Sequence, residues 1–238
     1  MNDAKPPQLG RHVVVRLGRI SDWIGDISSS EAVLNEEDKA RAARYRFPED
    51  RARFILGRIL LTLALQECRG GAPQPLNLRQ TEKGRPVLAD EPEIQFSISH
   101  SSELVGIALT LKSNIGIDLE AVSRPADLNS LAERIFSIFD QETFQKVPEG
   151  QRPAVFFRAW TAKEAYLKAL GLGLPGGLKG VLVPVDEADP ASPRVFHPDA
   201  GSGPWCLQRL PLPDGYSGCA VWDDPAKALD FRVAKPTG

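Results

Sequence analysis

Ile115-Gly-Ile-Asp-Leu-Glu120 alternates apolar residues with Gly116, Asp118 and Glu120. A period of two is typical of a β-strand, so both acids are predicted on one face, roughly 7 Å apart along the backbone. Asp and Glu are poor strand formers, and like charges on one face repel each other. A hard cation such as Mg²⁺ would relieve that repulsion, since it binds a few carboxylates together with substrate phosphates. The alternative without an ion is a strand with a solvated acidic face.

A second informative segment is Trp160-Thr-Ala-Lys-Glu-Ala-Tyr-Leu-Lys168. It is predicted to lie in a helix over residues 153–170, which opens with a proline and closes at a glycine. Within that helix Glu164 lies four residues after Trp160 and four before Lys168, so the three side chains follow one line. A carboxylate beside a large aromatic residue, at the edge of the apolar stripe, predicts a partly buried charge that needs an ion or ligand. The simpler alternative is an ordinary exposed Glu–Lys pair.

A third segment begins with Gly84-Arg85-Pro86, which is predicted to be a turn that presents a cation. It is followed by Gln95-Phe-Ser-Ile-Ser-His-Ser101, whose alternating apolar residues predict a strand that runs into Ser99 and His100. Small hydroxyls, backbone amides and an imidazole at a strand end are suited to binding an anion. A polar hairpin turn that leads into the next apolar strand is the alternative.

These segments, in this order and spacing, resemble the 4′-phosphopantetheinyl transferase superfamily, specifically its long, Sfp-like type. The family pattern is Gly-Lys/Arg-Pro, then Phe-x-x-Ser-His-Ser, then Gly-x-Asp-x-Glu, then Trp-x-x-Lys-Glu-x-x-x-Lys. This chain matches it at Gly84–Pro86, Phe96–Ser101, Gly116–Glu120 and Trp160–Lys168. The resemblance covers residues 13–175, and the remaining C-terminal part is only loosely patterned.

The resemblance implies transfer of the 4′-phosphopantetheine arm of coenzyme A to a serine of an apo acyl or peptidyl carrier protein, with release of adenosine 3′,5′-bisphosphate. It implies Mg²⁺ as the cofactor, bound by Asp118, Glu120 and Glu164. Glu164 is expected to take the serine proton, directly or through water, and Lys168 to contact the departing phosphate. Residues expected to bind the co-substrate coenzyme A are Arg53, Arg85, Ser99, His100, Lys163 and Lys168.

The chain departs from the family pattern at several cationic positions. Asp38 and Arg41 stand where the family often has lysines, which leaves the phosphate contacts of the first helix open. Arg85 stands where lysine is common, which keeps the charge but not the geometry. Cations crowd residues 39–58, where they form either a solvated face or a surface for phosphate or an acidic protein.

The order of predicted elements indicates an α+β fold. Strand, helices and several strands occur twice along the chain of 238 residues, which is long enough for two small subdomains. The resemblance implies a pseudo-dimer of two similar α/β halves with the active site between them. We therefore expect an N-terminal subdomain over residues 1–112, with the coenzyme nucleotide contacts, and a C-terminal subdomain over residues 113–238, with the metal and catalytic residues. Helices are predicted at 31–45, 50–68, 127–146 and 153–170, and strands near 13–17, 76–80, 94–99, 104–111, 115–121, 181–185, 205–210, 217–222 and 229–233.

Composition and charge narrow the class of protein further. The chain is 42% hydrophobic and 25% charged, as expected of an ordinary globular protein, and its net charge of −2 gives no reason to expect nucleic-acid binding. The first residues contain no apolar stretch of the signal-peptide type, and no segment has the apolar length that crosses a membrane. Three cysteines, an odd number without metal-ligand spacing, predict reduced thiols in the cytoplasm. We expect a monomer.

Two functions from other classes remain as alternatives. The first is a non-catalytic module that binds coenzyme A or docks a carrier protein, which the intact acids and Lys168 disfavour. The second is an unrelated Mg²⁺-dependent phosphohydrolase, which the absence of a nucleophile or a His-Asp metal cluster disfavours.

Overall fold

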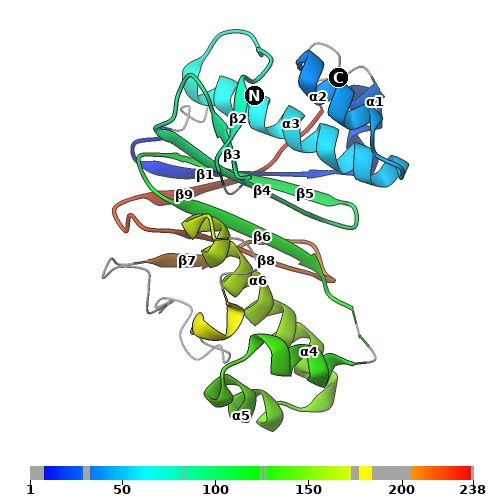
Figure 1. The fold of residues 1–238 in the computed structure, drawn as a ribbon, viewed down its shortest axis with the longest axis vertical. Coiled ribbons are helices and arrows are strands. Elements are labelled where there is room, and N and C mark those ends of the chain that lie inside the picture. Colours follow the sequence, from blue (N-terminus) through cyan, green and yellow to red (C-terminus); the bar gives the residue numbers. More distant parts are fainter. Residues whose placement is uncertain are drawn as a thin grey trace. The chain divides into compact units, whose positions relative to one another are not determined.

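The structure is a computed structural model that describes residues 8–28, 33–82, 84–123, 125, 127–172, 177–183 and 205–236. The described residues form two compact units. One unit contains those up to Lys112 together with those from Ala226 onward, and the other spans Ser113–Pro225. Each unit combines helices with a β-sheet, so the predicted α+β class is confirmed (Figure 1).

The first unit is built on a sheet with strand order β4-β5-β1-β9. Strands β4 and β1 both pair with β5 in antiparallel register, and a separate short hairpin joins β2 to β3. Its elements are β1 (His12–Arg19), η1 (Ile20–Trp23), α1 (Ile24–Ser28), α2 (Glu36–Ala43), α3 (Pro48–Arg69), β2 (Leu78–Gln80), β3 (Pro86–Leu88), β4 (Ile94–Ser101), β5 (Leu104–Leu111) and β9 (Ala228–Val233).

Helix α3 covers one face of this sheet and supplies most of the first core (Figure 1). It starts with a proline in the first turn, where the missing N–H costs no hydrogen bond, and ends before Gly70 at φ 78°. Leu56, Leu60 and Leu61 on the helix are fully buried, as are Val105 and Ile107 on β5. Each such side chain contributes about 1.5–3 kcal/mol of hydrophobic stabilisation.

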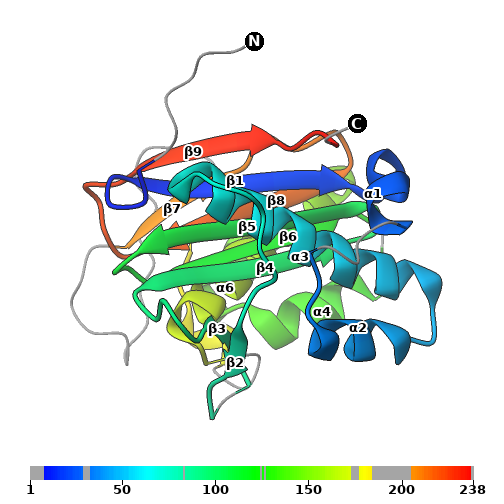
Figure 2. The same cartoon turned by 90° about the horizontal axis from the view of Figure 1, so that it is seen from above.

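The C-terminal strand corrects the expected subdomain of residues 113–238. β9 lies at the edge of the first sheet, parallel to β1, with Val13 opposite Leu229 and Val15 opposite Phe231 (Figure 2). The described residues after Pro225 therefore belong to the first unit. The strand itself was predicted near 229–233, but its partner depends on a long-range pairing that local periodicity does not specify.

The second unit is built on a three-stranded antiparallel sheet of order β6-β8-β7. The long helix α6 packs on β6 and β8 (Figure 1). Its elements are β6 (Ile115–Ala121), α4 (Leu128–Ile135), α5 (Ile138–Lys146), η3 (Glu149–Gln151), α6 (Arg152–Leu170), η5 (Leu178–Gly180), β7 (Cys206–Arg209) and β8 (Tyr216–Trp222).

Three sequence-based boundaries change. The helix predicted over 127–146 is two helices, because the side chain of Ser137 caps α5 by accepting a hydrogen bond from the N–H of Asp140. The helix predicted from residue 31 is described only from Glu36, where Asn35 supplies the cap, and residues 31 and 32 lie outside the described residues. The strand predicted near 181–185 is not formed by the described residues up to 183, and the rest lies outside them.

The cysteines are free thiols at Cys68, Cys206 and Cys219. Burial raises the pKa of Cys68 to about 11 and that of Cys219 to about 12, so both remain protonated near neutral pH and neither is a thiolate nucleophile. No helix among the described residues is long and apolar enough to span a membrane.

Candidate functional site

Gly116 on β6 permits a very close approach of α6. A Cβ built at this glycine would lie 1.8 Å from the carbonyl oxygen of Ala165 and 2.7 Å from the backbone nitrogen of Ala169. Glycine inside a strand often marks such an approach of another backbone. Because side chains alternate along a strand, Asp118 and Glu120 lie on the same face as Gly116 and also face the helix. The predicted strand and its acidic face are thereby confirmed.

Asp118 is only 4% exposed, so a fully solvated acidic strand face is wrong at this position. Its Oδ1 accepts a hydrogen bond from Nζ of Lys168 on α6, at 2.6 Å. The lysine side chain is 32% exposed, which leaves part of it accessible. The ion pair therefore joins the strand to the helix and presents a cation at the edge of a buried carboxylate.

Glu164 lies one turn before Lys168 on the same helix and is 8% exposed, so the exposed Glu–Lys pair considered as an alternative is wrong. Its Oε1 has no hydrogen-bond partner among the described residues. Burial raises the pKa of Glu164 from its ordinary value of 4.5 to about 7, Asp118 and Glu120 raise it as neighbouring negative charges, and Lys168 lowers it. Added positive charge would stabilise the ionised form of this carboxyl group.

The three predicted metal ligands thus come from facing surfaces of β6 and α6, near enough for the strand acids to raise the pKa of the helix acid. Across the described ranges, no three His, Cys, Asp or Glu side chains are grouped as around a bound metal ion. The positive charge beside Asp118 is the ammonium of Lys168. Three carboxylates, one with a buried oxygen that lacks a hydrogen bond, still match the ligand type that a hard cation prefers.

Lys163 requires a correction, because it was expected to contact coenzyme A. Its side chain is fully buried, and Nζ donates to Asp140 Oδ2 at 3.2 Å, to the carbonyl of Leu178 at 3.1 Å and to the carbonyl of Val181 at 2.5 Å. Burial lowers the pKa of this amine, and Asp140 partly offsets that effect. With its donors used inside the second unit, Lys163 does not reach a ligand. Sequence reasoning missed Asp140 as its partner.

In the first unit, Arg53 on α3 reaches the turn between β4 and β5. Its Nη1 donates to the carbonyl of Ser102 at 3.0 Å, and its Nη2 donates to Asp50 Oδ1 at 2.6 Å. Ser102 adopts a positive φ of 51°, which shapes this turn. His100 lies two residues earlier, near the end of β4, and is exposed. The structure therefore brings Arg53 and the end of β4 together.

Arg85 contacts the backbone of β4 from the neighbouring hairpin, whereas Ser99 is part of β4 itself. Arg85 follows the hairpin turn, and its Nη2 donates to the carbonyl of Phe96 on β4 at 3.2 Å. Burial lowers the pKa of this guanidinium. Ser99 is buried and points to the opposite side of β4 from His100, because adjacent strand residues alternate faces. The polar end of β4 is thus part of a paired strand, and its two predicted ligand residues do not share a face.

Asp38 explains one departure from the family pattern. It is buried on α2 and accepts a hydrogen bond from Arg58 Nε on α3 at 2.9 Å, while the Arg58 guanidinium lies 4.7 Å from the ring centre of Phe54. Part of the cationic cluster is therefore used to hold α2 against α3 rather than exposed to solvent or to a ligand.

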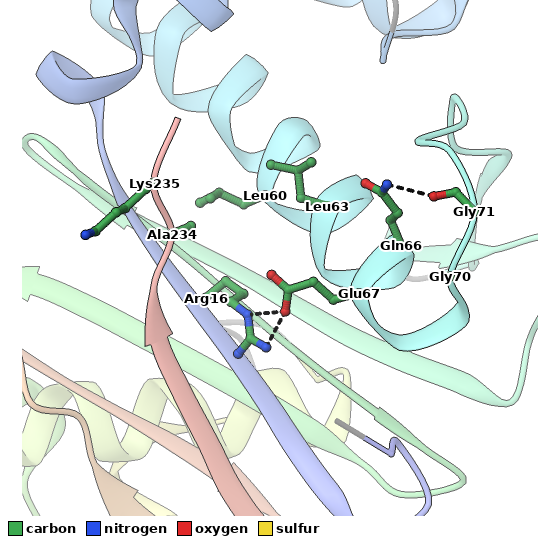
Figure 3. Close-up of a pocket in the computed structure, with 9 residues that line it drawn as sticks. All are labelled: Arg16, Leu60, Leu63, Gln66, Glu67, Gly70, Gly71, Ala234 and Lys235. Atoms are coloured by element: carbon green, nitrogen blue, oxygen red, sulfur yellow. Dashed lines mark hydrogen bonds and ion pairs between the residues drawn. The ribbon is translucent and has the colours of Figure 1, made fainter. Parts of the chain in front are cut away.

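A cavity of about 350 Å³ lies beside the C-terminal end of α3 in the first unit (Figure 3). Its polar wall is an internal ion pair that sequence reasoning did not anticipate. Arg16, which is buried, donates through Nε and Nη2 to Glu67 Oε2 and through Nη1 to Asp230 Oδ1. Two carboxylates already neutralise this guanidinium, so Arg16 is not available to bind a phosphate. Lys235 also lines the cavity.

The raised pKa of Glu164 predicts a pH-dependent stability in metal-free buffer. Its pKa in the fold exceeds the unfolded value, so its contribution to stability is fully present below about pH 4.5 and is lost as the pH rises through about 7. The glutamine side chain of Glu164→Gln is uncharged at every pH, so this variant avoids that loss of stability. Because one pKa unit corresponds to about 1.4 kcal/mol, the rise in pKa from 4.5 to about 7 makes the loss about 3 kcal/mol. The melting temperature of the variant relative to that of the parent should increase as the pH rises across this range. A difference that is constant with pH would contradict the assignment.

Comparison with known proteins gives one match for each half of the chain. The family model described as "4′-phosphopantetheinyl transferase superfamily" matches residues 114–221, and the model described as "4′-phosphopantetheinyl transferase, N-terminal" matches residues 23–112. These matches support the expected pseudo-dimer of two subdomains.

Among curated relatives, the 4′-phosphopantetheinyl transferase HetI of Nostoc sp. is 38% identical over 193 residues, which cover 80% of this chain and 78% of that protein. The 4′-phosphopantetheinyl transferase psf-1 of Bacillus pumilus is 30% identical over 207 residues, covering 87% and 86%. A crystal structure of a holo-(acyl-carrier-protein) synthase from Bacillus anthracis in complex with CoA matches with a TM-score of 0.37 and 19% identity, covering 42% of this chain and 94% of that one. On the identity and coverage of its curated relatives, this chain belongs to the 4′-phosphopantetheinyl transferase superfamily, and to its long, Sfp-like type.

Proposed function

We propose that this transferase moves the 4′-phosphopantetheine arm of coenzyme A to a serine of an apo acyl or peptidyl carrier protein in a Mg²⁺-dependent reaction centred on Asp118, Glu120 and Glu164. The observation that carries the proposal is the buried Glu164, whose Oε1 lacks a hydrogen-bond partner among the described residues. Beside it, the Asp118–Lys168 pair combines a buried carboxylate with a partly accessible ammonium.

Mg²⁺ fits the donor set formed by these three side chains. Each supplies carboxylate oxygens, and the pKa of Glu164 is raised partly by the other two charges, so a divalent cation would relieve a repulsion that the fold creates. When bound, Mg²⁺ supplies neutralisation of charge on the pyrophosphate of coenzyme A. The proposed ligands are Asp118, Glu120 and Glu164.

The chain's own residues have distinct roles in the proposed reaction. The serine oxygen of the carrier forms a bond to the phosphorus that bears the pantetheine arm, and the bond from that phosphorus to the oxygen shared with the nucleotide breaks. Glu164 takes the serine proton, directly or through water, because Mg²⁺ would favour its ionised form and a carboxylate is the form that accepts a proton. Lys168 stabilises the negative charge that develops on the departing adenosine 3′,5′-bisphosphate.

Coenzyme recognition is proposed for Arg53, Arg85, Ser99 and His100 of the first unit, which would bind the nucleotide end and chiefly its 3′-phosphate. Charged donors suit a phosphate because charge-assisted hydrogen bonds are shorter and stronger than neutral ones. The side chain of Ser99 is buried on the other face of β4 from His100, so the contact proposed for Ser99 is weaker than those proposed for the other three residues. Free thiols support our further proposal of a cytoplasmic location, and the modest net charge gives no reason to expect nucleic-acid binding. We further propose a monomer that binds no membrane.

Arg85→Ala should narrow the preference for coenzyme A over dephospho-coenzyme A by about tenfold or more. A hydrogen bond to a charged group contributes about 1.5–3 kcal/mol. The variant would remove such a bond from coenzyme A, which carries the 3′-phosphate, but not from dephospho-coenzyme A, which lacks it. Binding of both ligands to the variant and to an Arg79→Ala control, an exposed arginine on β2, gives the measurement. If the ratio for Arg85→Ala equals that of the parent, Arg85 acts elsewhere.

The decisive experiment incubates the protein with coenzyme A, Mg²⁺ and an apo carrier protein, then weighs the carrier. A mass gain of one phosphopantetheine arm that disappears when Mg²⁺ is chelated supports the proposal. Binding of coenzyme A without any gain across a panel of acyl and peptidyl carriers would instead favour the non-catalytic module.

A further inference from the structure

Lys163 is a charged side chain in the interior of the second unit, and it is held from three directions. Its Nζ lies 3.2 Å from Asp140 Oδ2, 3.1 Å from the carbonyl oxygen of Leu178 and 2.5 Å from that of Val181. The ring of Phe136 completes the surroundings, with its centre 5.6 Å from the ammonium. The side chain has no exposed surface, so solvent does not share in these contacts.

These contacts connect α6 to two other parts of the unit. Asp140 belongs to the capping box of α5, in which its carboxylate also accepts from the N–H of Ser137 at 3.3 Å. Leu178 begins η5, and Val181 follows it and is fully buried in the second core. The amine of Lys163 therefore links α6, the start of α5 and the chain around residues 178–181.

The opposite interface of α6 has a different character. There the helix lies against β6 through Gly116, Ala165 and Ala169, which bring the two backbones into contact. Such a surface fixes how near the helix comes, but small side chains interdigitate little and give weak resistance to rotation or sliding. The rotation of α6 is therefore fixed by contacts on its other sides, which include the buried core residues Phe156, Tyr166 and Leu167 and the amine of Lys163.

Rotation matters because the candidate catalytic side chains lie on the same helix. Glu164 directly follows Lys163 and projects about 100° around the helix from it, and Lys168 lies about one turn further on. The Lys168 ammonium meets Asp118 at 2.6 Å, so the rotation of α6 sets where this ammonium starts relative to the strand acid.

We propose that the buried Lys163–Asp140 pair is a positioning device that fixes the rotation of α6 and so directs Glu164 and Lys168 toward Asp118. This inference rests on the proposed function, because the proposed function assigns Glu164 and Lys168 their catalytic roles. Stability alone does not explain the pair, because replacing a buried ion pair by apolar residues of similar volume is often neutral or stabilising. Lys163 is a positioning residue here, because its Nζ donates to Asp140, Leu178 and Val181 inside the unit.

The test uses the full chain with Lys163→Met and Asp140→Asn combined. Removing both charges avoids the unpaired buried carboxylate that Lys163→Met alone would leave, and Asn retains an oxygen for the capping box. We expect a folded protein with a lowered melting temperature, because the carbonyls of Leu178 and Val181 lose the donor that Lys163 supplies. We also expect a kcat at least about tenfold lower and a KM for coenzyme A within about twofold, because a misdirected base affects the chemical step. The matched control is Lys146→Met on α5, an exposed lysine, which should behave like the parent.

A second readout does not depend on turnover. Mg²⁺ should raise the melting temperature of the parent by bringing the three carboxylates together, and the double variant should lose most of that rise. Asp140→Glu, which keeps the charge but shifts it by one methylene, should lower kcat with little effect on KM, and it serves as the test if the double variant does not fold.

Outcomes separate this inference from the proposed function. Parent-like kcat and a parent-like Mg²⁺ response in a folded double variant, or in Asp140→Glu if the double variant does not fold, would overturn the positioning role. A parent that modifies no carrier protein would instead overturn the proposed function, while the Mg²⁺-induced rise and its loss in the variants would still decide whether Lys163 positions the acids.

Discussion

Glu164→Gln is expected to lower the rate of phosphopantetheine transfer by about a hundredfold or more while the protein remains folded. Removal of a positioned general base typically costs about 10²–10⁴ in rate. The amide keeps the size of the side chain, so the buried position is filled, but it removes both the basicity and the negative charge. Initial rates of transfer to an apo carrier protein over a range of Mg²⁺ concentrations give the measurement.

The control for this variant is Glu142→Gln, an exposed acid on α5 that should leave the rate unchanged. A Glu164→Gln variant that transfers at the parent rate at low Mg²⁺ would show that this carboxylate is neither base nor metal ligand. A rate that recovers fully at high Mg²⁺ would retain the metal role and exclude the base.

Gly116→Ala is expected to destabilise the second unit by more than about 4 kcal/mol, a size seen only for severe structural disruption. The added methyl group would lie 1.8 Å from the carbonyl oxygen of Ala165, and this neighbour is backbone that no change of rotamer can move. To relieve the overlap, α6 must separate from β6, which opens the core and breaks the contact between Lys168 and Asp118.

Urea unfolding of Gly116→Ala and of Gly150→Ala provides the comparison for this prediction. Gly150 lies in the same unit, its added methyl group would meet nothing within 4 Å, and its φ is not positive. Hydrogen exchange should show the loss of protection in β6 and α6. A Gly116→Ala midpoint equal to that of the control would mean that the helix accommodates the methyl group without cost.

Local signals in the sequence determined much of the second unit. Alternation over residues 115–121 gave the strand and put both acids on one face, and the proline and glycine at the ends of residues 153–170 gave the helix, which closes at Gly171 with φ 66°. These features depend on neighbours within a few positions, where backbone geometry alone sets the period. The break between α4 and α5 was missed by the single helix predicted over 127–146, although Ser137 and Asp140 have the spacing of a capping box.

Only the tertiary structure decided which of these side chains meet. A period of two cannot show that β9 pairs with β1, and a helical period cannot show that Lys168 reaches Asp118 or that Lys163 is buried against Asp140. Lys163 and Glu164 are adjacent in sequence, yet one lies in the core and the other beside the strand acids. The physical reason is that burial and ion pairing depend on where separate elements pack, and that packing follows from long-range contacts such as Gly116 against Ala165.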